Sequence, residues 1–86
     1  MALVWRCPQP GAVAKTSGQP TESRLTFGRR LREERNRRGM TLEDLAEASG
    51  LTWSYIAQIE VGRRNVGVDN MDRLARGVGV PLKELL

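Results

Sequence analysis

The chain has 86 residues and a formal net charge of +4, with 14 Lys and Arg residues against 10 Asp and Glu residues. It has no histidine and a single cysteine, Cys7, which excludes an intramolecular disulfide, histidine-ligated metal sites and catalysis by a Ser–His or Cys–His pair. This length and composition favour one cytoplasmic domain that is not an enzyme and needs no cofactor or metal.

Residues 1–23 differ in composition from the rest of the chain. They carry three of the four prolines and show neither a helical nor an alternating pattern of apolar residues. We therefore predict a flexible N-terminal arm over residues 1–23 and a folded domain over residues 24–86. No stretch of the chain approaches the about 20 apolar residues of a membrane-spanning helix, so we expect no membrane partner.

A first helix is predicted over residues 25–38, with Gly39 as its C-terminal cap. One face carries its apolar residues and one arginine: Leu25, Phe27 or Gly28, Leu31 and Arg35. Seven arginines and two glutamates lie between Arg24 and Gly39. Arginine is suited to bidentate phosphate contacts, although a run of this kind also serves as an ordinary solvated helix face.

Two short helices are predicted next, each opened by a threonine. Thr41 lies three residues before Asp44, which predicts a capping box with Asp in place of Glu, and this helix ends at Ser49–Gly50. Thr52 is a good N-cap for the following helix, which ends near Val61–Gly62. The residues expected to face inward are Leu42, Leu45, Ala46, Ile56 and Ile59.

These two helices and their short connection predict a helix-turn-helix unit. Ala46 is small enough for the close crossing of the helices, and Gly50 suits a turn that needs a positive φ. A fourth helix is predicted over residues 68–77, and a fifth runs from Pro81 to Leu86 because proline favours the first helical turn. All connections are short, so the predicted fold is all-α, a compact five-helix domain.

The stretch from Thr41 to Arg64 resembles the signature of the phage Cro and repressor (Xre-type, lambda-repressor-like) helix-turn-helix family. The resemblance rests on Ala46, Gly50 and the spacing of Ile56, Ile59, Glu60, Gly62 and Arg63. The later run Val78-Gly-Val-Pro-Leu-Lys-Glu-Leu-Leu86 is similar to the usual fifth helix of that family. The resemblance covers residues 25–86, and a looser one links the Arg63-Arg64-Asn65 segment to controller proteins of restriction–modification systems.

This resemblance implies a role for individual residues. It places the helix at about residues 52–61 in the major groove of double-stranded DNA, where Gln58 is chemically the best reader of adenine. The implied base-reading residues are Trp53, Ser54 and Gln58. The implied phosphate contacts are Thr41, Tyr55, Arg63, Arg64 and Asn65. It also implies an ion pair between Arg35 and Glu60 that holds the recognition helix against the first helix.

Three positions depart from the usual pattern of the family. Leu42 stands where a glutamine commonly braces a phosphate and a base-reading residue, so that brace is missing. Trp53 replaces a smaller polar residue, and it either contacts a thymine methyl or a sugar or turns inward. Gly67 stands where Ser or Thr often caps the next helix, which puts that cap and its phosphate contact in doubt.

The C-terminal helices carry more apolar residues than one small core is expected to bury. The implied homodimer surface comprises Met71, Val78, Val80, Leu82, Leu85 and Leu86. A two-fold dimer would present its recognition helices one DNA turn apart, about 34 Å, to a palindromic operator. The alternative is that these residues close the core of a monomer.

The sequence therefore predicts a sequence-specific, double-stranded DNA-binding transcriptional regulator. The alternative function is a protein-binding module, such as an antitoxin that holds a protein partner through its helices and N-terminal arm. An enzyme is the least favoured reading, because no nucleophile–base pair or metal cluster can be assembled from these residues.

Overall fold

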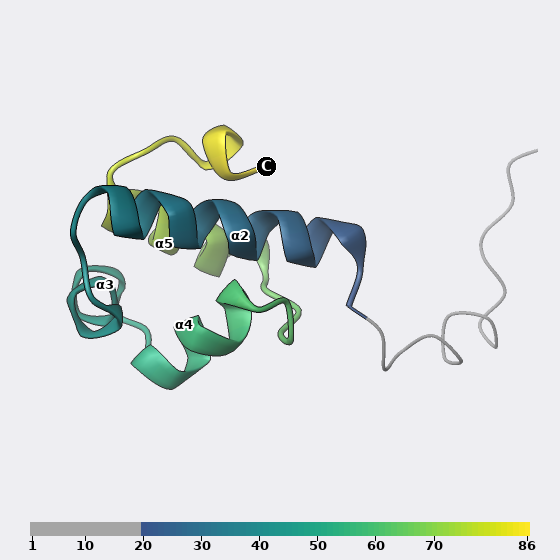
Figure 1. Ribbon diagram of the computed structural model, residues 1–86, viewed down its shortest axis with the longest axis horizontal. Coiled ribbons are helices and arrows are strands. Elements are labelled where there is room, and N and C mark those ends of the chain that lie inside the picture. Colours follow the sequence, from purple (N-terminus) through teal and green to yellow (C-terminus); the bar gives the residue numbers. More distant parts are fainter. Residues whose placement is uncertain (1–19) are drawn as a thin grey trace, which may run out of the picture.

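The computed structural model describes residues 20–86, and most of the predicted arm, residues 1–19, lies outside the described residues. All secondary-structure elements of the described residues are helices, joined by short loops (Figure 1). Its elements are α2 (Glu22–Arg37), α3 (Leu42–Ser49), α4 (Trp53–Glu60), α5 (Val68–Val78) and the 3-10 helix η1 (Leu82–Leu85). The predicted all-α class is confirmed. The predicted fifth α-helix is wrong in type, because Leu82–Leu85 form one short 3-10 helix.

The first helix begins at Glu22, three residues before the predicted start. Thr21 is its N-cap, and its hydroxyl accepts a hydrogen bond from the amide of Arg24 at 3.1 Å. Apolar periodicity begins only at Leu25, so the polar first turn gives no periodic signal. The start of α2 therefore lies inside the segment assigned to the arm.

Local capping explains where α3 and α4 begin. The amide of Asp44 donates to the hydroxyl of Thr41 at 3.0 Å, and the amide of Thr41 donates to the carboxylate of Asp44 at 2.9 Å. These two bonds complete the predicted capping box. The hydroxyl of Thr52 accepts from the amide of Tyr55 at 3.3 Å, and Gly50 occupies the predicted left-handed turn at φ 78°. The turn geometry of the helix-turn-helix unit thus follows from local sequence.

The long helix α2 is the central element of the fold. It contacts α4, α5 and η1, while α3 contacts α4 and α5. In Figure 1, α4 and η1 lie on opposite sides of α2. The buried core is formed by Phe27, Leu31, Leu45, Ile56, Ile59, Val66, Leu74, Ala75, Val78 and Leu85. No described helix has the length and apolar character that crossing a bilayer requires.

The crossing of α2 and α4 is closer than a side chain permits. A Cβ atom added at Gly28 would lie 2.7 Å from the carbonyl oxygen of Glu60, and closer still to that of Ile59. Both contacts are with backbone atoms at the end of α4, so the backbones themselves meet here. Gly28 therefore sets how near the C-terminal turn of α4 can approach α2.

Several residues differ in burial from their predicted positions. Val78 and Leu85 are completely or almost completely buried in the core of this single chain. The prediction that these two residues form a dimer surface is therefore wrong, because no part of their side chains remains to meet a second copy. Leu25, predicted to lie on the apolar face of the first helix, is 44% exposed, although its side chain lies against Gly62.

Candidate nucleic-acid interface

Helix α4 has one buried face and one exposed face. Ile56 and Ile59 are buried in the core, whereas Trp53 is 55% exposed and Ser54 is exposed beside it in the first turn. Gln58 is half-buried one turn later. The three residues implied to read bases thus lie on one short helix, and none of them belongs to the buried core.

The other end of α4 is attached to α2 by an ion pair. The Nε atom of Arg35 donates to Glu60 Oε2 at 2.7 Å, and a terminal guanidinium nitrogen donates to Oε1 at 3.0 Å. The side chains are only 12% and 5% exposed. The structure therefore brings together the two residues that the family resemblance pairs, in a bidentate and largely buried contact.

Arg35 also joins α2 to the segment that precedes α3. Its second terminal nitrogen donates to the carbonyl oxygen of Met40 at 2.8 Å. The hydrogen bond to Glu60 is the largest influence on the guanidinium and raises the pKa of Arg35, against the opposite effect of burial. One fixed positive charge thus holds both the end of α4 and the start of the helix-turn-helix unit.

The loop after α4 turns back along that helix. Gly62 adopts a φ of 83°, and the amide of Arg63 donates to the carbonyl oxygen of Gln58 at 2.8 Å. The side chains of Arg63, Arg64 and Asn65 are exposed on this loop. Two arginines implied to contact phosphate are therefore presented immediately beside the end of α4.

Arg64 makes two contacts with side chains of α4. Its Nε atom donates to Gln58 Oε1 at 2.5 Å, and its guanidinium carbon lies 5.7 Å from the centre of the Tyr55 ring. The Tyr55 hydroxyl in turn accepts a hydrogen bond from the Asn70 amide group of α5 at 3.3 Å. The sequence predicted separate DNA contacts for Gln58, Arg64 and Tyr55 and gave no role to Asn70. Nothing in the spacing of these residues indicates that their side chains contact one another.

The start of α3 is less open to phosphate than the sequence suggested. Thr41 is exposed, but its hydroxyl and amide are both engaged in the capping box with Asp44. Glu43 adds a second carboxylate in the first turn. The helix dipole still favours an anion here, while the two carboxylates oppose it, so the Thr41 phosphate contact stays a prediction.

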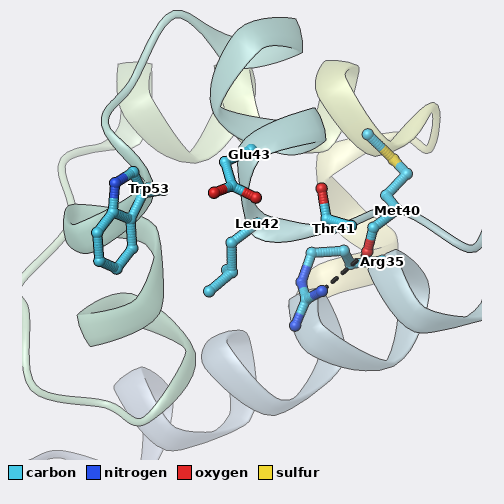
Figure 2. Close-up of a pocket in the computed structure, with 6 residues that line it drawn as sticks. All are labelled: Arg35, Met40, Thr41, Leu42, Glu43 and Trp53. Atoms are coloured by element: carbon cyan, nitrogen blue, oxygen red, sulfur yellow. Dashed lines mark hydrogen bonds between the residues drawn. The ribbon is translucent and has the colours of Figure 1, made fainter.

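A hollow of about 430 Å³ lies between the starts of α3 and α4. It is lined by Arg35, Met40, Thr41, Leu42, Glu43 and Trp53. Figure 2 shows Leu42 between the Trp53 ring and the side chain of Arg35. Two of the departures from the family pattern, Leu42 and Trp53, therefore line the same hollow and give it an apolar wall.

The residues implied at a dimer surface fall into three groups. Val78 and Leu85 are buried, as described above, and Met71, Val80 and Leu82 are half-buried against the core. Leu86 is 58% exposed and, with Met71, lines a hollow of about 230 Å³ that reaches Phe27 of α2. An exposed apolar surface thus remains at the C-terminal end of the described chain, although smaller than predicted.

Comparison with known proteins gives a consistent result. A family model described as helix-turn-helix matches residues 31–85, which include α3, α4, α5 and η1. Control protein C.BamHI from Bacillus amyloliquefaciens is 41% identical over 64 residues, which cover 73% of this chain and 79% of that protein. Control protein C.MunI from a Mycoplasma species is 32% identical over 63 residues, which cover 72% of this chain and 85% of that protein.

A solved structure extends the likeness to three dimensions. The restriction-modification controller protein C.AhdI from Aeromonas hydrophila superposes with a TM-score of 0.74 at 39% identity. The match covers 77% of this chain and 100% of that chain. The arrangement of helices around the α3–α4 unit is therefore that of a solved controller protein.

Proposed function

This chain belongs to the Xre-type helix-turn-helix family and is a DNA-binding transcriptional regulator, and we propose that it reads its operator with the exposed face of α4. The observation that carries this assignment is the exposure of Trp53 and Ser54 on a helix whose opposite face is buried and whose end is held by Arg35 and Glu60. A helix fixed in this way can enter the major groove without rearrangement. Arg63 and Arg64 lie beside it, where they can contact the backbone of the same duplex.

We infer that the protein acts as a homodimer on a two-fold operator in the cytoplasm. The exposed Leu86 and the half-buried Met71 offer an apolar surface beside the first turns of α2. The similarity to restriction–modification controllers supports the further inference that it regulates its own promoter or neighbouring genes of such a system. The proteins compared are regulators and controllers, so the alternative role as an antitoxin is not supported.

The proposal predicts that the loop arginines contribute to binding independently of DNA sequence. Arg63→Ala should weaken binding to every duplex alike, because a phosphate contact carries no sequence information. The slope of the logarithm of the association constant against the logarithm of the salt concentration should become shallower by about 0.9 for each phosphate group that the variant no longer neutralises. Fluorescence anisotropy with the DNA upstream of its gene, across a salt series, measures both quantities. Sedimentation of the complex gives the number of protomers per duplex.

Arg73→Ala is the matched control, since Arg73 is an exposed arginine that belongs to α5 and not to the loop that follows α4. It should leave the salt slope unchanged. Binding by the wild type that is weak and indifferent to sequence would contradict the proposed function.

A second prediction concerns Trp53 and the apolar wall that it forms with Leu42. We expect the exposed indole to contact a thymine methyl group, because an apolar side chain in the major groove distinguishes thymine in this way. Replacing that thymine with deoxyuridine should weaken wild-type binding about fourfold, the value of one buried methyl group. Trp53→Ala should bind both duplexes equally in the anisotropy assay, while Trp53→Phe should keep the difference. An equal effect for every thymine in the operator would contradict this role.

A further inference from the structure

We propose that Arg64 is a positioning residue that fixes the side-chain amide of Gln58 so that it reads guanine instead of adenine. This inference rests on the proposed function, because it concerns which base the exposed face of α4 recognises. The sequence alone favoured adenine as the target of Gln58. The contacts of Gln58 in the folded chain lead to a different base.

A free glutamine amide suits adenine because it offers one acceptor and one donor side by side. Adenine presents the N6 amino donor next to the N7 acceptor, so both atoms of the amide are used. In this structure one of the two lone pairs of the acceptor is already engaged, because Gln58 Oε1 accepts the Nε–H of Arg64 at 2.5 Å. An adenine amino group approaching the same oxygen would meet a positively charged donor already bound there.

Apart from the second lone pair of Gln58 Oε1, the remaining hydrogen-bonding groups of this pair are donors. Gln58 retains its NH₂ group, and the guanidinium of Arg64 carries no acceptor. Guanine presents only acceptors, N7 and O6, on its major-groove edge. A surface of donors therefore complements guanine and opposes the amino group of adenine.

The position of Arg64 is itself fixed by the fold. Its guanidinium lies 5.7 Å from the centre of the Tyr55 ring, within the range of a cation–π contact. The Tyr55 hydroxyl is held in place by the 3.3 Å hydrogen bond that Asn70 of α5 donates to it. Tyr55 and Gln58 are three residues apart and share a face of α4, so one arginine spans both side chains. The orientation of Gln58 is thus set before DNA arrives.

The test determines base preference at each operator position with wild type, Gln58→Ala, Arg64→Ala and Arg63→Ala. Preferred duplexes are first selected from a random pool. Single-base variants of the selected duplex are then measured by fluorescence anisotropy. The position read by Gln58 is the one whose preference disappears in Gln58→Ala. There the wild type should prefer guanine over adenine about tenfold or more, and 7-deazaguanine, which lacks N7, should weaken its binding.

Arg64→Ala should reverse this preference to adenine, because the freed amide can then make the bidentate contact. Arg63→Ala is the matched control, since Arg63 is the neighbouring exposed arginine of the same loop, and it should keep the guanine preference. A wild type that already prefers adenine, or an Arg64→Ala variant that still prefers guanine, would overturn the inference while leaving the regulator assignment intact. A wild type without preference at any position would overturn both.

Discussion

Replacing Arg35 with alanine is expected to lower the free energy of unfolding by about 3–5 kcal/mol. The substitution leaves Glu60 as an unpaired carboxylate whose side chain is only 5% exposed, and it also removes the hydrogen bond to the Met40 carbonyl. For a domain of this size the melting temperature should fall by about 15 °C or more. Thermal unfolding followed by circular dichroism measures this shift.

Arg32→Ala is the matched control, because Arg32 is an exposed arginine on the same helix. It should shift the melting temperature by no more than about 4 °C. Replacing both partners, as in Arg35→Leu with Glu60→Leu, should recover much of the stability, since no buried charge is then left without a partner. If Arg35→Ala and Glu60→Ala both melt like the wild type, the ion pair does not hold the recognition helix.

Gly28→Ala is expected to destabilise the protein by about 1–3 kcal/mol, although alanine is the better helix former by about 1 kcal/mol. The new methyl group would lie 2.7 Å from the Glu60 carbonyl oxygen and closer still to that of Ile59, and a backbone atom cannot move aside as a flexible side chain can. The end of α4 must therefore shift away from α2. We expect weaker binding to the operator as well as a lower melting temperature.

Gly77→Ala provides the comparison, because it makes the same change near the end of another helix. A Cβ atom at Gly77 would meet the terminal methyl of Leu45 at 2.8 Å, and a side-chain end can adjust. Its cost should therefore be smaller than that of Gly28→Ala in thermal and urea unfolding. A Gly28→Ala variant that is more stable than the wild type would show that helix propensity outweighs the close approach.

The parts of the fold that sequence could predict are those governed by neighbours in the chain. Thr41, Thr52 and Gly50 are recognisable because a cap or a left-handed turn depends on residues only a few positions away. The polar first turn of α2 and the 3-10 form of Leu82–Leu85 were missed, because apolar periodicity indicates neither.

The features that could not be predicted from the sequence depend on which helices contact one another. Gly28 in sequence is only a weak helix former, and its role becomes visible when the end of α4 is placed against it. Val78 and Leu85 looked available for a partner because apolar character alone does not reveal whether one chain already covers it. The contact between Arg64 and Gln58 requires the turn at Gly62, which brings a loop residue back over the helix that precedes it.

The separation of α4 into a buried face and an exposed face affects how such a regulator can evolve. Burial of Ile56 and Ile59 and the ion pair of Glu60 commit one face and one end of this eight-residue helix to the fold. Trp53 and Ser54 belong neither to the buried face nor to the ion pair. If Trp53 and Ser54 read bases as proposed, substitutions at these two positions can recode the operator with little penalty to folding, so a duplicated gene could acquire a new target through very few changes.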